Sequence, residues 1–240
     1  MNQVAALQEM ISDSRNIVFF GGAGVSTESG IPDFRSVDGL YHQQFQYPPE
    51  TMLSHSFFLS HTEEFFDFYR KKMICPTAKP NPAHLKLAEL ERAGKLRAIV
   101  TQNIDNLHQL GGAKRVLELH GSVFRNHCMD CGQFYDLDFV MERRGVPRCT
   151  RCSGIVKPDV VLYEEPLDMS VMSAAMEAIE QADMLIIGGT SLVVYPAAGL
   201  IRYFKGDKLV VINKAATEYD NRAALSISQP IGQVLSQIAV

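Results

Sequence analysis

The sequence predicts an α/β protein built on a doubly wound parallel sheet, with a four-cysteine insert near the middle of the chain. Short apolar runs typical of buried strands alternate with helical stretches along the whole chain. Turns of small residues follow two of those runs, at positions 21–24 and 188–191, and a parallel sheet binds its ligands at such turns. Two Cys-x-x-Cys pairs lie between these turns and have the spacing of a zinc site.

The composition is that of a single enzyme-sized unit. The chain has 240 residues, of which 46% are hydrophobic, enough for a sizeable core. Its net charge of −4 and pI near 6.0 give no basic footprint for nucleic acid. Residues 1–16 predict a short amphipathic helix with Leu7, Met10 and Ile11 on one face, rather than a signal peptide. Because no apolar run approaches the roughly 18 residues that cross a bilayer, we expect a cytoplasmic protein that binds neither membranes nor nucleic acid.

The glycine-rich stretch from Ile17 to Ser36 predicts a nucleotide site. Its apolar run, Ile17–Phe20, breaks into small residues that let a phosphate approach the backbone at the start of a following helix. Thr27 stands where the dinucleotide fingerprint has its third glycine, and the stretch Leu40–Gln46, where a carboxylate for the ribose is expected, contains none. An ordinary dehydrogenase is therefore disfavoured. Phe34 and Arg35 lie just beyond the turn, where a ring can cover a flat group and a guanidinium can pair with pyrophosphate.

An aperiodic stretch follows the glycine-rich loop. Residues 30–53 show neither helical nor strand periodicity, which predicts a binding loop or, alternatively, a plain surface loop. Ser54–Met73 predicts one helix whose aromatic side chains are core packing. Asn81 and Pro82 predict the start of a helix that Gly94 ends.

Polar side chains follow the strand predicted at Leu96–Val100. They are Gln102, Asn103, Asp105 and His108. The carboxyl end of a parallel strand is where ligands bind, although an Asx turn or a helix cap would also explain Asn103 or Asp105.

His120 directly follows the next predicted strand, Arg115–Leu119. Histidine titrates near working pH, so at a strand end beside a nucleotide site it is a candidate general base. A structural histidine is the alternative, and the position at the strand end favours catalysis over it.

The four cysteines Cys128, Cys131, Cys149 and Cys152 predict one structural zinc ion. The two pairs are 17 residues apart, and two such turns can close a tetrahedral site with no open position. Disulfides or redox-active thiols are the alternative, which the lack of a secretion signal disfavours. The mixed charges of the insert indicate a scaffold rather than a nucleic-acid contact. Cys75 is left over as a free thiol.

The last third of the chain predicts a return to the main sheet. The residues after the insert form an extended, β-branched segment, and further strands and helices alternate to the end of the chain. The predicted elements are, in order, the extended segment Lys157–Glu165, a strand at Ala182–Ile187, a phosphate or ribose turn at Gly188–Ser191, a helix from Pro196, a strand at Lys208–Ile212 and a helix at Gly232–Ile238.

A series of motifs runs through the chain in order. It consists of Gly22-Ala23-Gly24-Val25-Ser26, Gly30-Ile31-Pro32-Asp33-Phe34-Arg35, Thr101-Gln102-Asn103-Ile104-Asp105-Asn106-Leu107-His108, His120-Gly121, the two cysteine pairs, Gly189-Thr190-Ser191 and Val211-Ile212-Asn213. Together these motifs resemble the sirtuin family of NAD-dependent protein deacylases, in its bacterial form. No single motif would suffice, but the ordered series is highly specific.

This resemblance implies a division into two domains. A Rossmann-like NAD-binding domain would comprise residues 1–35, 84–120 and 158–240. A smaller domain would comprise a cofactor loop with a helical insertion, residues 36–83, and the zinc-ribbon insertion, residues 121–157. NAD would bind between the two.

The resemblance also implies roles for individual residues. His120 would be the base, and Asn103 would share in catalysis and, with Ile104 and Asp105, would receive nicotinamide. The cofactor residues implied are Ala23, Thr27, Phe34, Arg35, Gln102, Ile104, Asp105, Thr190, Ser191, Asn213 and Ile231. The acylated peptide would lie along Val160, Val161, Leu162 and Tyr163.

The implied reaction uses NAD and an acetylated protein lysine. The acyl carbonyl oxygen attacks the nicotinamide ribose and expels nicotinamide. His120 then activates a ribose hydroxyl, and free lysine and O-acetyl-ADP-ribose result. We expect a monomeric deacetylase with NAD as cofactor and one structural zinc ion.

Two places depart from the family pattern. Tyr163-Glu164-Glu165 stands where the family's substrate strand has phenylalanine, glycine and glutamate, which bears on how a peptide approaches. Relatives that remove succinyl groups carry a tyrosine and, three residues later, an arginine. Tyr69 and Lys72 keep the positive charge without the bidentate fork, so we expect deacetylation to dominate over desuccinylation.

Three other classes of function compete with this interpretation. A binding module on a decayed enzyme fold would lack His120, Asn103 or Asp105, and all three are present. A redox enzyme would need the missing ribose carboxylate. A transferase that moves ADP-ribose onto protein shares the chemistry up to nicotinamide loss, and the mass of the product separates it from a deacetylase.

Overall fold

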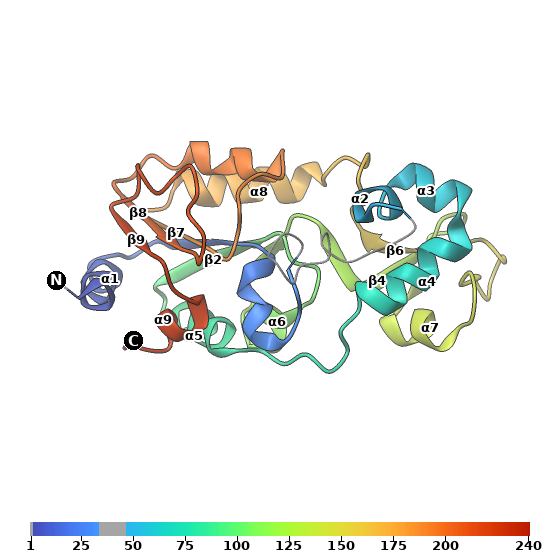
Figure 1. Cartoon of the computed structure of the whole chain (residues 1–240), viewed down its shortest axis with the longest axis horizontal. Coiled ribbons are helices and arrows are strands. Elements are labelled where there is room, and N and C mark those ends of the chain that lie inside the picture. The colour runs from blue at the N-terminus through green and yellow to red at the C-terminus, as the bar shows by residue number, and fades with distance from the viewer. Residues whose placement is uncertain (1, 34–46) are drawn as a thin grey trace.

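The structure, a computed structural model, describes residues 2–33 and 47–240. A parallel sheet lies at one end of an elongated molecule together with both termini, and a small antiparallel sheet lies at the other end (Figure 1). The parallel sheet has six strands in the order β3-β2-β1-β7-β8-β9. Its strands are β1 (Ile17–Gly21), β2 (Leu96–Thr101), β3 (Val116–Glu118), β7 (Met184–Gly188), β8 (Lys208–Ile212) and β9 (Leu225–Ile227).

The strand order confirms the predicted doubly wound sheet. From β1 the chain builds outward through β2 and β3, and later returns to the other side of β1 to add β7, β8 and β9. Every pairing in this sheet is parallel. The order therefore reverses between β1 and β7, and ligands of such sheets bind outside the carboxyl ends of the strands at that point.

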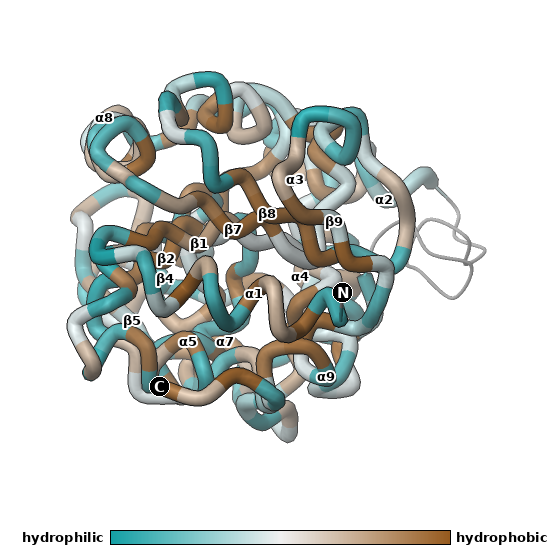
Figure 2. Tube along the Cα trace, turned by 90° about the vertical axis from the view of Figure 1, so that its left-hand side faces the viewer, coloured by the Kyte–Doolittle hydropathy of each residue, from teal (hydrophilic) through white to brown (hydrophobic). Residues whose placement is uncertain are grey.

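Alternating side chains of β1 enter two separate cores. Ile17 and Phe19 pack against one helical layer, while Val18 and Phe20 pack against the other. Strands β1 and β7 are buried on both faces, which explains their unbroken apolar runs, and they lie in the apolar centre of the molecule in Figure 2. The first layer contains α1 (Gln3–Ser12), α5 (Pro82–Arg92) and α9 (Ile231–Leu235), and the second contains α8 (Met169–Glu180) and the 3-10 helix Ala197–Tyr203.

A third core builds the small domain. Aromatic side chains of α3 and α4 pack against apolar residues of the small sheet, which confirms that they are core packing. The helical insertion and the cysteine insert therefore share one core. The elements are α2 (Pro49–Met52), α3 (His55–Ser60), α4 (Thr62–Lys72) and α7 (Leu137–Glu142), with strands β5 (Phe134–Tyr135), β4 (Gly121–Cys128) and β6 (Val156–Val160) in that spatial order.

Several predicted helix boundaries are confirmed. Leu7 and Ile11 of α1 are buried, as the amphipathic pattern predicts. Asn81 caps α5 by accepting a hydrogen bond from the Ala83 N–H, and Gly94 ends it with φ +74°. The helix predicted at 232–238 is shorter, because α9 ends at Leu235. Helix α8 and strand β9 were not predicted.

The predicted helix after the glycine-rich loop is wrong. Two 3-10 turns, Ala23–Val25 and Thr27–Ser29, occupy this stretch instead. The Thr27 hydroxyl donates to the carbonyl of Gly24, and Gly30 then adopts φ +84°. A left-handed residue so soon after the turn stops helix growth.

The single helix predicted at Ser54–Met73 is also wrong. The backbone breaks at His61, with φ −132° and ψ 47°, to give α3 and α4. Hydroxyl groups on both sides of the break donate to carbonyls one turn back, Ser60 to Ser56 and Thr62 to Phe58. Such side-chain bonds compete with the helical ladder.

The extended segment after the cysteine insert does not rejoin the parallel sheet, contrary to the sequence prediction. Strand β6 pairs antiparallel with β4, so residues 156–160 belong to the small sheet. Within the stretch predicted to be aperiodic, residues 49–52 form the short helix α2. The division of the chain into domains at the predicted boundaries stays a proposal.

No helix in the described ranges, 2–33 and 47–240, combines the length and the apolar character needed to cross a membrane.

Two histidines lie against each other in the first core. The rings of His84 and His108 are 4.8 Å apart at their centroids, and both side chains are fully buried. The Nδ1 atom of His84 accepts the Asn81 N–H, whereas the His84 Nε2 and both ring nitrogens of His108 have no partner among the described residues. Burial lowers the pKa of His84 to about 4 and that of His108 well below 6.5.

We therefore expect stability to fall as the pH drops through the window between 6.5 and about 4. Below pH 6.5 the unfolded chain binds a proton at His84, whereas the folded chain binds it only near pH 4. This difference in pKa amounts to about 3 kcal/mol at the acid end of the window. Urea unfolding across this range measures it. His84→Gln keeps an acceptor for the Asn81 N–H and should remove this part of the pH dependence, and an unchanged slope in that variant would contradict the assignment.

Candidate functional site

A cavity of about 990 Å³ lies at the carboxyl ends of β1, β2 and β7. It extends from the glycine-rich loop past His120 to the segment 160–165. The residues predicted for catalysis, cofactor and substrate that line it are Ala23, Thr27, Gln102, Asn103, Ile104, Asp105, His120, Val160, Val161, Leu162, Tyr163, Thr190, Ser191, Asn213 and Ile231. Phe34 and Arg35 lie outside the described residues.

Two small-residue loops meet at one end of the cavity. The N–H of Gly24 donates to the carbonyl of Gly189 at 2.8 Å. A Cβ atom at Gly22 would lie 2.8 Å from the Cβ of Thr190, and one at Gly24 would lie 2.8 Å from the Cα of Gly189. These glycines are therefore required by the contact between the loops, a reason that the sequence alone did not reveal.

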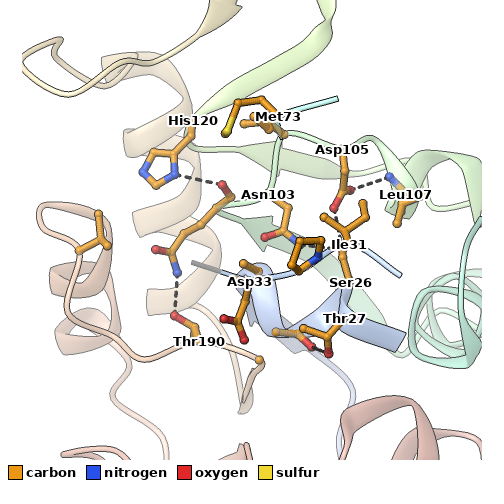
Figure 3. Close-up of a pocket in the computed structure, with 18 of the residues that line it drawn as sticks. Ser26, Thr27, Ile31, Asp33, Met73, Asn103, Asp105, Leu107, His120 and Thr190 are labelled. Atoms are coloured by element: carbon orange, nitrogen blue, oxygen red, sulfur yellow. Dashed lines mark hydrogen bonds between the residues drawn. The ribbon is translucent and has the colours of Figure 1, made fainter. Parts of the chain in front are cut away.

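A buried polar network lies beside this loop (Figure 3). The Ser26 hydroxyl donates to one carboxylate oxygen of Asp105 at 2.6 Å, and the Leu107 N–H donates to the other at 2.9 Å. The Asn103 side-chain amide donates to the Ser26 oxygen at 3.0 Å. Burial raises the pKa of Asp105, and the hydrogen bonds from Ser26 and Leu107 oppose that rise.

The network separates the two alternatives for these polar residues. Asp105 does form the Asx-type contact just before α6 (Leu107–Leu110), so the Asx-turn alternative is right for part of its role, whereas the N-cap of this helix is Asn106. The Asn103 side chain instead faces Ser26. Ser26 was not among the predicted site residues, although it belongs to the glycine-rich motif. His108 is not brought into the cavity, because its ring packs in the core against His84 and Phe19.

His120 is held in one orientation by the backbone. Its Nδ1 atom lies 3.0 Å from the carbonyl oxygen of Gln102. A carbonyl can only accept, so Nδ1 carries the hydrogen and Nε2 keeps its lone pair. Burial lowers the pKa of His120 and the Gln102 carbonyl opposes this, with burial the larger effect. A neutral imidazole with a free Nε2 is the state that a general base needs.

The Gln102 side chain connects His120 to the far loop. Its amide donates to the Thr190 hydroxyl at 3.0 Å (Figure 3). Thr190 is in turn fixed by Asn213, whose side chain accepts the Thr190 N–H at 3.1 Å and donates to the Thr190 carbonyl at 2.7 Å. Ile231 packs at the base of this loop, where a Cβ at Gly188 would lie 2.2 Å from its Cδ1.

The segment 160–165 forms the opposite end of the cavity. The Val161 N–H donates to the His120 carbonyl at 3.0 Å. The Tyr163 N–H donates to the Leu53 carbonyl, and the Tyr163 carbonyl accepts the His55 N–H, both at 3.0 Å. A peptide that adds as a strand to this edge would therefore not pair with the backbone of Tyr163.

Tyr69 and Lys72 do not form the pair that the sequence suggested. The Tyr69 side chain is fully buried among Phe65 and Phe66, and burial raises its pKa. Lys72 lines the cavity, but Tyr69 does not. The helix turns Tyr69 toward the aromatic core, so it contributes packing rather than acyl recognition.

The four insert cysteines converge on one point. Their Sγ atoms all lie within 4.8 Å of one another. The Sγ atoms of Cys128 and Cys152 are 3.4 Å apart, and those of Cys131 and Cys149 are 3.6 Å apart. A disulfide needs about 2.05 Å, whereas tetrahedral zinc with bonds of about 2.3 Å separates its sulfurs by about 3.8 Å. The donor set and its spacing thus fit zinc.

Tyr135 supports the cysteine cluster from inside the small domain. Its hydroxyl donates to the Cys149 Sγ at 3.1 Å and itself accepts the Thr150 N–H at 2.8 Å. The Arg151 N–H also donates to Cys149 at 3.3 Å. Such donors fix the orientation of a ligand sulfur and stabilise it as a thiolate.

Comparison with known proteins decides the family. A family model described as "Sir2 family" matches residues 22–196, which include both loops, His120 and all four cysteines. The chain belongs to the Sir2 family. The motif series predicted this family.

Close relatives cover the whole of this Sir2 chain. A protein of Clostridium acetobutylicum named "NAD-dependent protein deacetylase" is 62% identical over 99% of this chain and 98% of its own length. One of Fusobacterium nucleatum with the same name is 45% identical over 98% of this chain and 91% of its own length.

Solved Sir2 structures share the fold. One described as "Structural Basis for the Mechanism and Regulation of Sir2 Enzymes" has a TM-score of 0.88 and 40% identity, over 98% of this chain and 96% of its own. Another, described as "Sir2-p53 peptide-NAD+", has a TM-score of 0.85 and 39% identity, over 98% of this chain and 96% of its own. The second contains, by its description, a peptide and NAD+.

Proposed function

We infer that this Sir2 family chain is an NAD-dependent protein lysine deacetylase that releases nicotinamide and O-acetyl-ADP-ribose. Relatives up to 62% identical along nearly their full length carry the name of that activity. A solved Sir2 structure with 37% identity and a TM-score of 0.84 is described as holding 2′-O-acetyl-ADP-ribose and a deacetylated peptide. The observation that carries the inference here is the half-buried, singly oriented His120 in the cavity beside Asn103 and Asp105.

The cavity suits NAD in size and in chemistry. Pockets for such ligands are typically about 300–1,000 Å³, and this one has about 990 Å³. It lies at the switch point of the sheet and begins at the glycine-rich loop, where backbone N–H groups can face phosphate. We propose that Ala23, Thr27, Phe34 and Arg35 hold the diphosphate half, and that Thr190, Ser191, Asn213 and Ile231 hold the adenosine half.

The nicotinamide end is proposed to lie at Asn103, Ile104 and Asp105. A carboxamide needs both donors and acceptors when it is buried, and the Asn103 and Asp105 side chains offer both. NAD supplies the glycosidic bond that breaks and the ribose hydroxyls that receive the acetyl group. Gln102 is close to His120 through its carbonyl and would meet the ribose with its side chain.

His120 would accept the proton of a ribose hydroxyl at Nε2. Its Nδ1–H stays bonded to the Gln102 carbonyl, so the ring does not need to turn during the transfer. The lowered pKa of His120 keeps the ring neutral until that proton arrives.

Zinc would be held by Cys128, Cys131, Cys149 and Cys152, away from the reacting atoms. Four protein ligands leave no open position, so the metal organises the small domain rather than taking part in catalysis. The acetylated peptide is proposed to enter along Val160, Val161, Leu162 and Tyr163. Because Tyr69 is buried in the core and the Lys72 ammonium lacks the bidentate fork of an arginine, we keep the preference for acetyl over succinyl groups.

A monomer in the cytoplasm, without nucleic-acid partners, is the proposed setting. The net charge of −4 supports the absence of nucleic-acid binding. No cysteine in the described part of the chain forms a disulfide, which is typical of a reducing compartment.

The decisive experiment follows the products by mass spectrometry. The purified chain is incubated with NAD and matched acetyl-lysine and succinyl-lysine peptides, and nicotinamide and ADP-ribose products are measured. We expect acetyl loss coupled to O-acetyl-ADP-ribose, with much slower succinyl loss. ADP-ribose attached to protein would favour the transferase alternative, and the absence of nicotinamide release would refute the proposed function.

The network at Asp105 yields a further prediction. Asp105→Asn keeps the shape but replaces the charged acceptor of the Ser26 hydroxyl. Hydrogen bonds to charged groups contribute about 1.5–3 kcal/mol, so we expect kcat/KM for NAD to fall by about 10- to 100-fold. Steady-state kinetics with an acetyl-lysine peptide measure it. Glu28 lies in the same loop as Ser26, but its carboxylate accepts a hydrogen bond from the Gly232 N–H of α9. Glu28→Gln should therefore lower kcat/KM for NAD much less. Equal losses in both variants would argue against a specific role for Asp105.

A further inference from the structure

Glu164 has an unusual backbone conformation at the mouth of the cavity. Its φ is +76°, in the left-handed region that few residues other than glycine adopt, and its side chain is exposed. Glu164 lines the cavity in the same segment as Val161, whose N–H is bonded to the backbone of His120. A non-glycine residue in this conformation costs free energy, and such outliers cluster at functional sites.

The Glu164 carboxylate is held in place by the helical insertion. The Ser56 N–H donates to one carboxylate oxygen at 2.8 Å, and the Ser56 hydroxyl donates to the other at 3.0 Å. Both donors lie in the first turn of α3, so the side chain bridges the two parts of the small domain. A carboxylate has about four lone-pair positions, so two remain for another donor.

Within residues 2–33 and 47–240, no cation pairs with the Glu164 carboxylate. Its neighbour Glu165 pairs with His55 at 2.8 Å and with Lys157 at 3.1 Å. A fixed, exposed and uncompensated carboxylate presents negative potential to whatever enters this end of the cavity.

The substrate must enter from this end. If NAD occupies the loops at Ala23 and Thr190, the acetyl-lysine can reach His120 from the side walled by residues 160–165. The residues beside the acetyl-lysine then pass over Glu164. This step rests on the proposed function.

We propose that Glu164 is a specificity-determining residue that binds a basic side chain of the acetylated peptide close to the acetyl-lysine. Ser56 positions the carboxylate of Glu164, a residue that lines the cavity and is exposed. A lysine or arginine donor would take the remaining lone pairs. An acidic residue at the same place would be repelled.

The test uses sets of three acetyl-lysine peptides that differ at a single position, which holds arginine, glutamine or glutamate. One set varies the residue before the acetyl-lysine, and a second set varies the residue after it. We expect kcat/KM for the arginine peptide to exceed that for the glutamate peptide by about three- to fivefold, the range of exposed ion pairs. The difference should lie in KM, and about 0.5 M salt should reduce it. The KM for NAD should not change.

Two variants identify the group responsible. Glu164→Gln keeps the size and one oxygen acceptor for Ser56 but loses the charge, so the ratio between arginine and glutamate peptides should fall to about one. Glu9→Gln removes the same unit of charge from an exposed site on α1, at the end of the molecule that holds the termini, and should leave the ratio unchanged. Glu164→Gly, which suits the backbone at this position, checks that a folded chain without the carboxylate also loses the preference.

The outcomes separate this inference from the proposed function. If the wild-type chain deacetylates all three peptides at equal rates, or if Glu164→Gln keeps the ratio, the inference is overturned while the function stands. If no peptide loses its acetyl group, the proposed function itself fails. A ratio that changes equally in Glu164→Gln and Glu9→Gln would reflect net charge and would also overturn the inference.

Discussion

His120→Ala is expected to lower the rate of NAD-dependent acetyl loss by about 10²- to 10⁴-fold, the range contributed by a positioned general base. The Nδ1–H of His120 is bonded to the Gln102 carbonyl at 3.0 Å, which leaves Nε2 as the acceptor facing the cavity. The variant removes that acceptor but none of the groups proposed to hold NAD. Binding of NAD, measured by calorimetry, and the melting temperature should therefore stay close to those of the parent chain.

The pH profile provides a second readout for His120. Burial lowers its pKa from 6.5, so the neutral base persists as the pH falls below that value. The rate should be constant above pH 6.5 and fall only as the pH drops through the lowered pKa. His127→Ala, at an exposed position of β4, is the matched control and should keep both rate and profile. Full activity in His120→Ala would show that the base is assigned wrongly.

The parallel sheet could be predicted because burial on both faces leaves a clear trace in the sequence. Ile17–Phe20 and Lys208–Ile212 are apolar at nearly every position, and their strands differ from prediction by one residue or none. The break at His61 could not be predicted in this way. It depends on hydroxyl groups of Ser60 and Thr62 that compete with the helical ladder, inside a stretch whose aromatic pattern suits one helix.

Partner strands were harder to predict than strands themselves. The sequence shows that residues near Val160 are extended, but pairing with β4 depends on contacts across the whole insert. The same holds for Gly22 and Gly24. A glycine-rich loop predicts close approach of a ligand, while its contact with Gly189, more than 160 residues away in the chain, appears only in the folded structure.

The predicted site residues lie in one cavity because most of them follow strands. The ends of strands can be predicted from the local sequence, and the sheet brings these ends together. His120, Asn103 and Thr190 each follow a strand, and a parallel sheet puts those ends on one edge. Tyr69 belongs to the aromatic stripe predicted to be mostly core packing, and the structure confirms this, although its spacing from Lys72 had also suggested a comparison with acyl-recognition residues. The tyrosine packs in the hydrophobic core of the small domain, so this face of α4 does not meet the cavity.

Cys149→Ala is expected to abolish zinc binding and to unfold much of the small domain. Cys149 is one of four sulfurs within 4.8 Å, and its Sγ also accepts hydrogen bonds from Tyr135 and Arg151. Structural zinc in small domains contributes about 10–16 kcal/mol, as much as the stability of a whole protein. Zinc content should fall from one ion per chain to none, and the melting temperature should drop by about 10 °C or more.

A milder variant tests the same site if Cys149→Ala does not fold. Tyr135→Phe keeps the ring, which packs on Phe139 at 3.9 Å between centroids, but removes the hydroxyl that donates to Cys149. Loss of such a partner typically costs about 10- to 100-fold in metal affinity, so a competing chelator should remove zinc faster from a chain that is still folded. Cys75→Ala removes the one cysteine outside the cluster and should keep a full zinc ion. A folded Cys149→Ala chain with one tightly bound zinc would refute the four-cysteine site, because three sulfurs and water make an open site of the catalytic kind rather than a closed structural one.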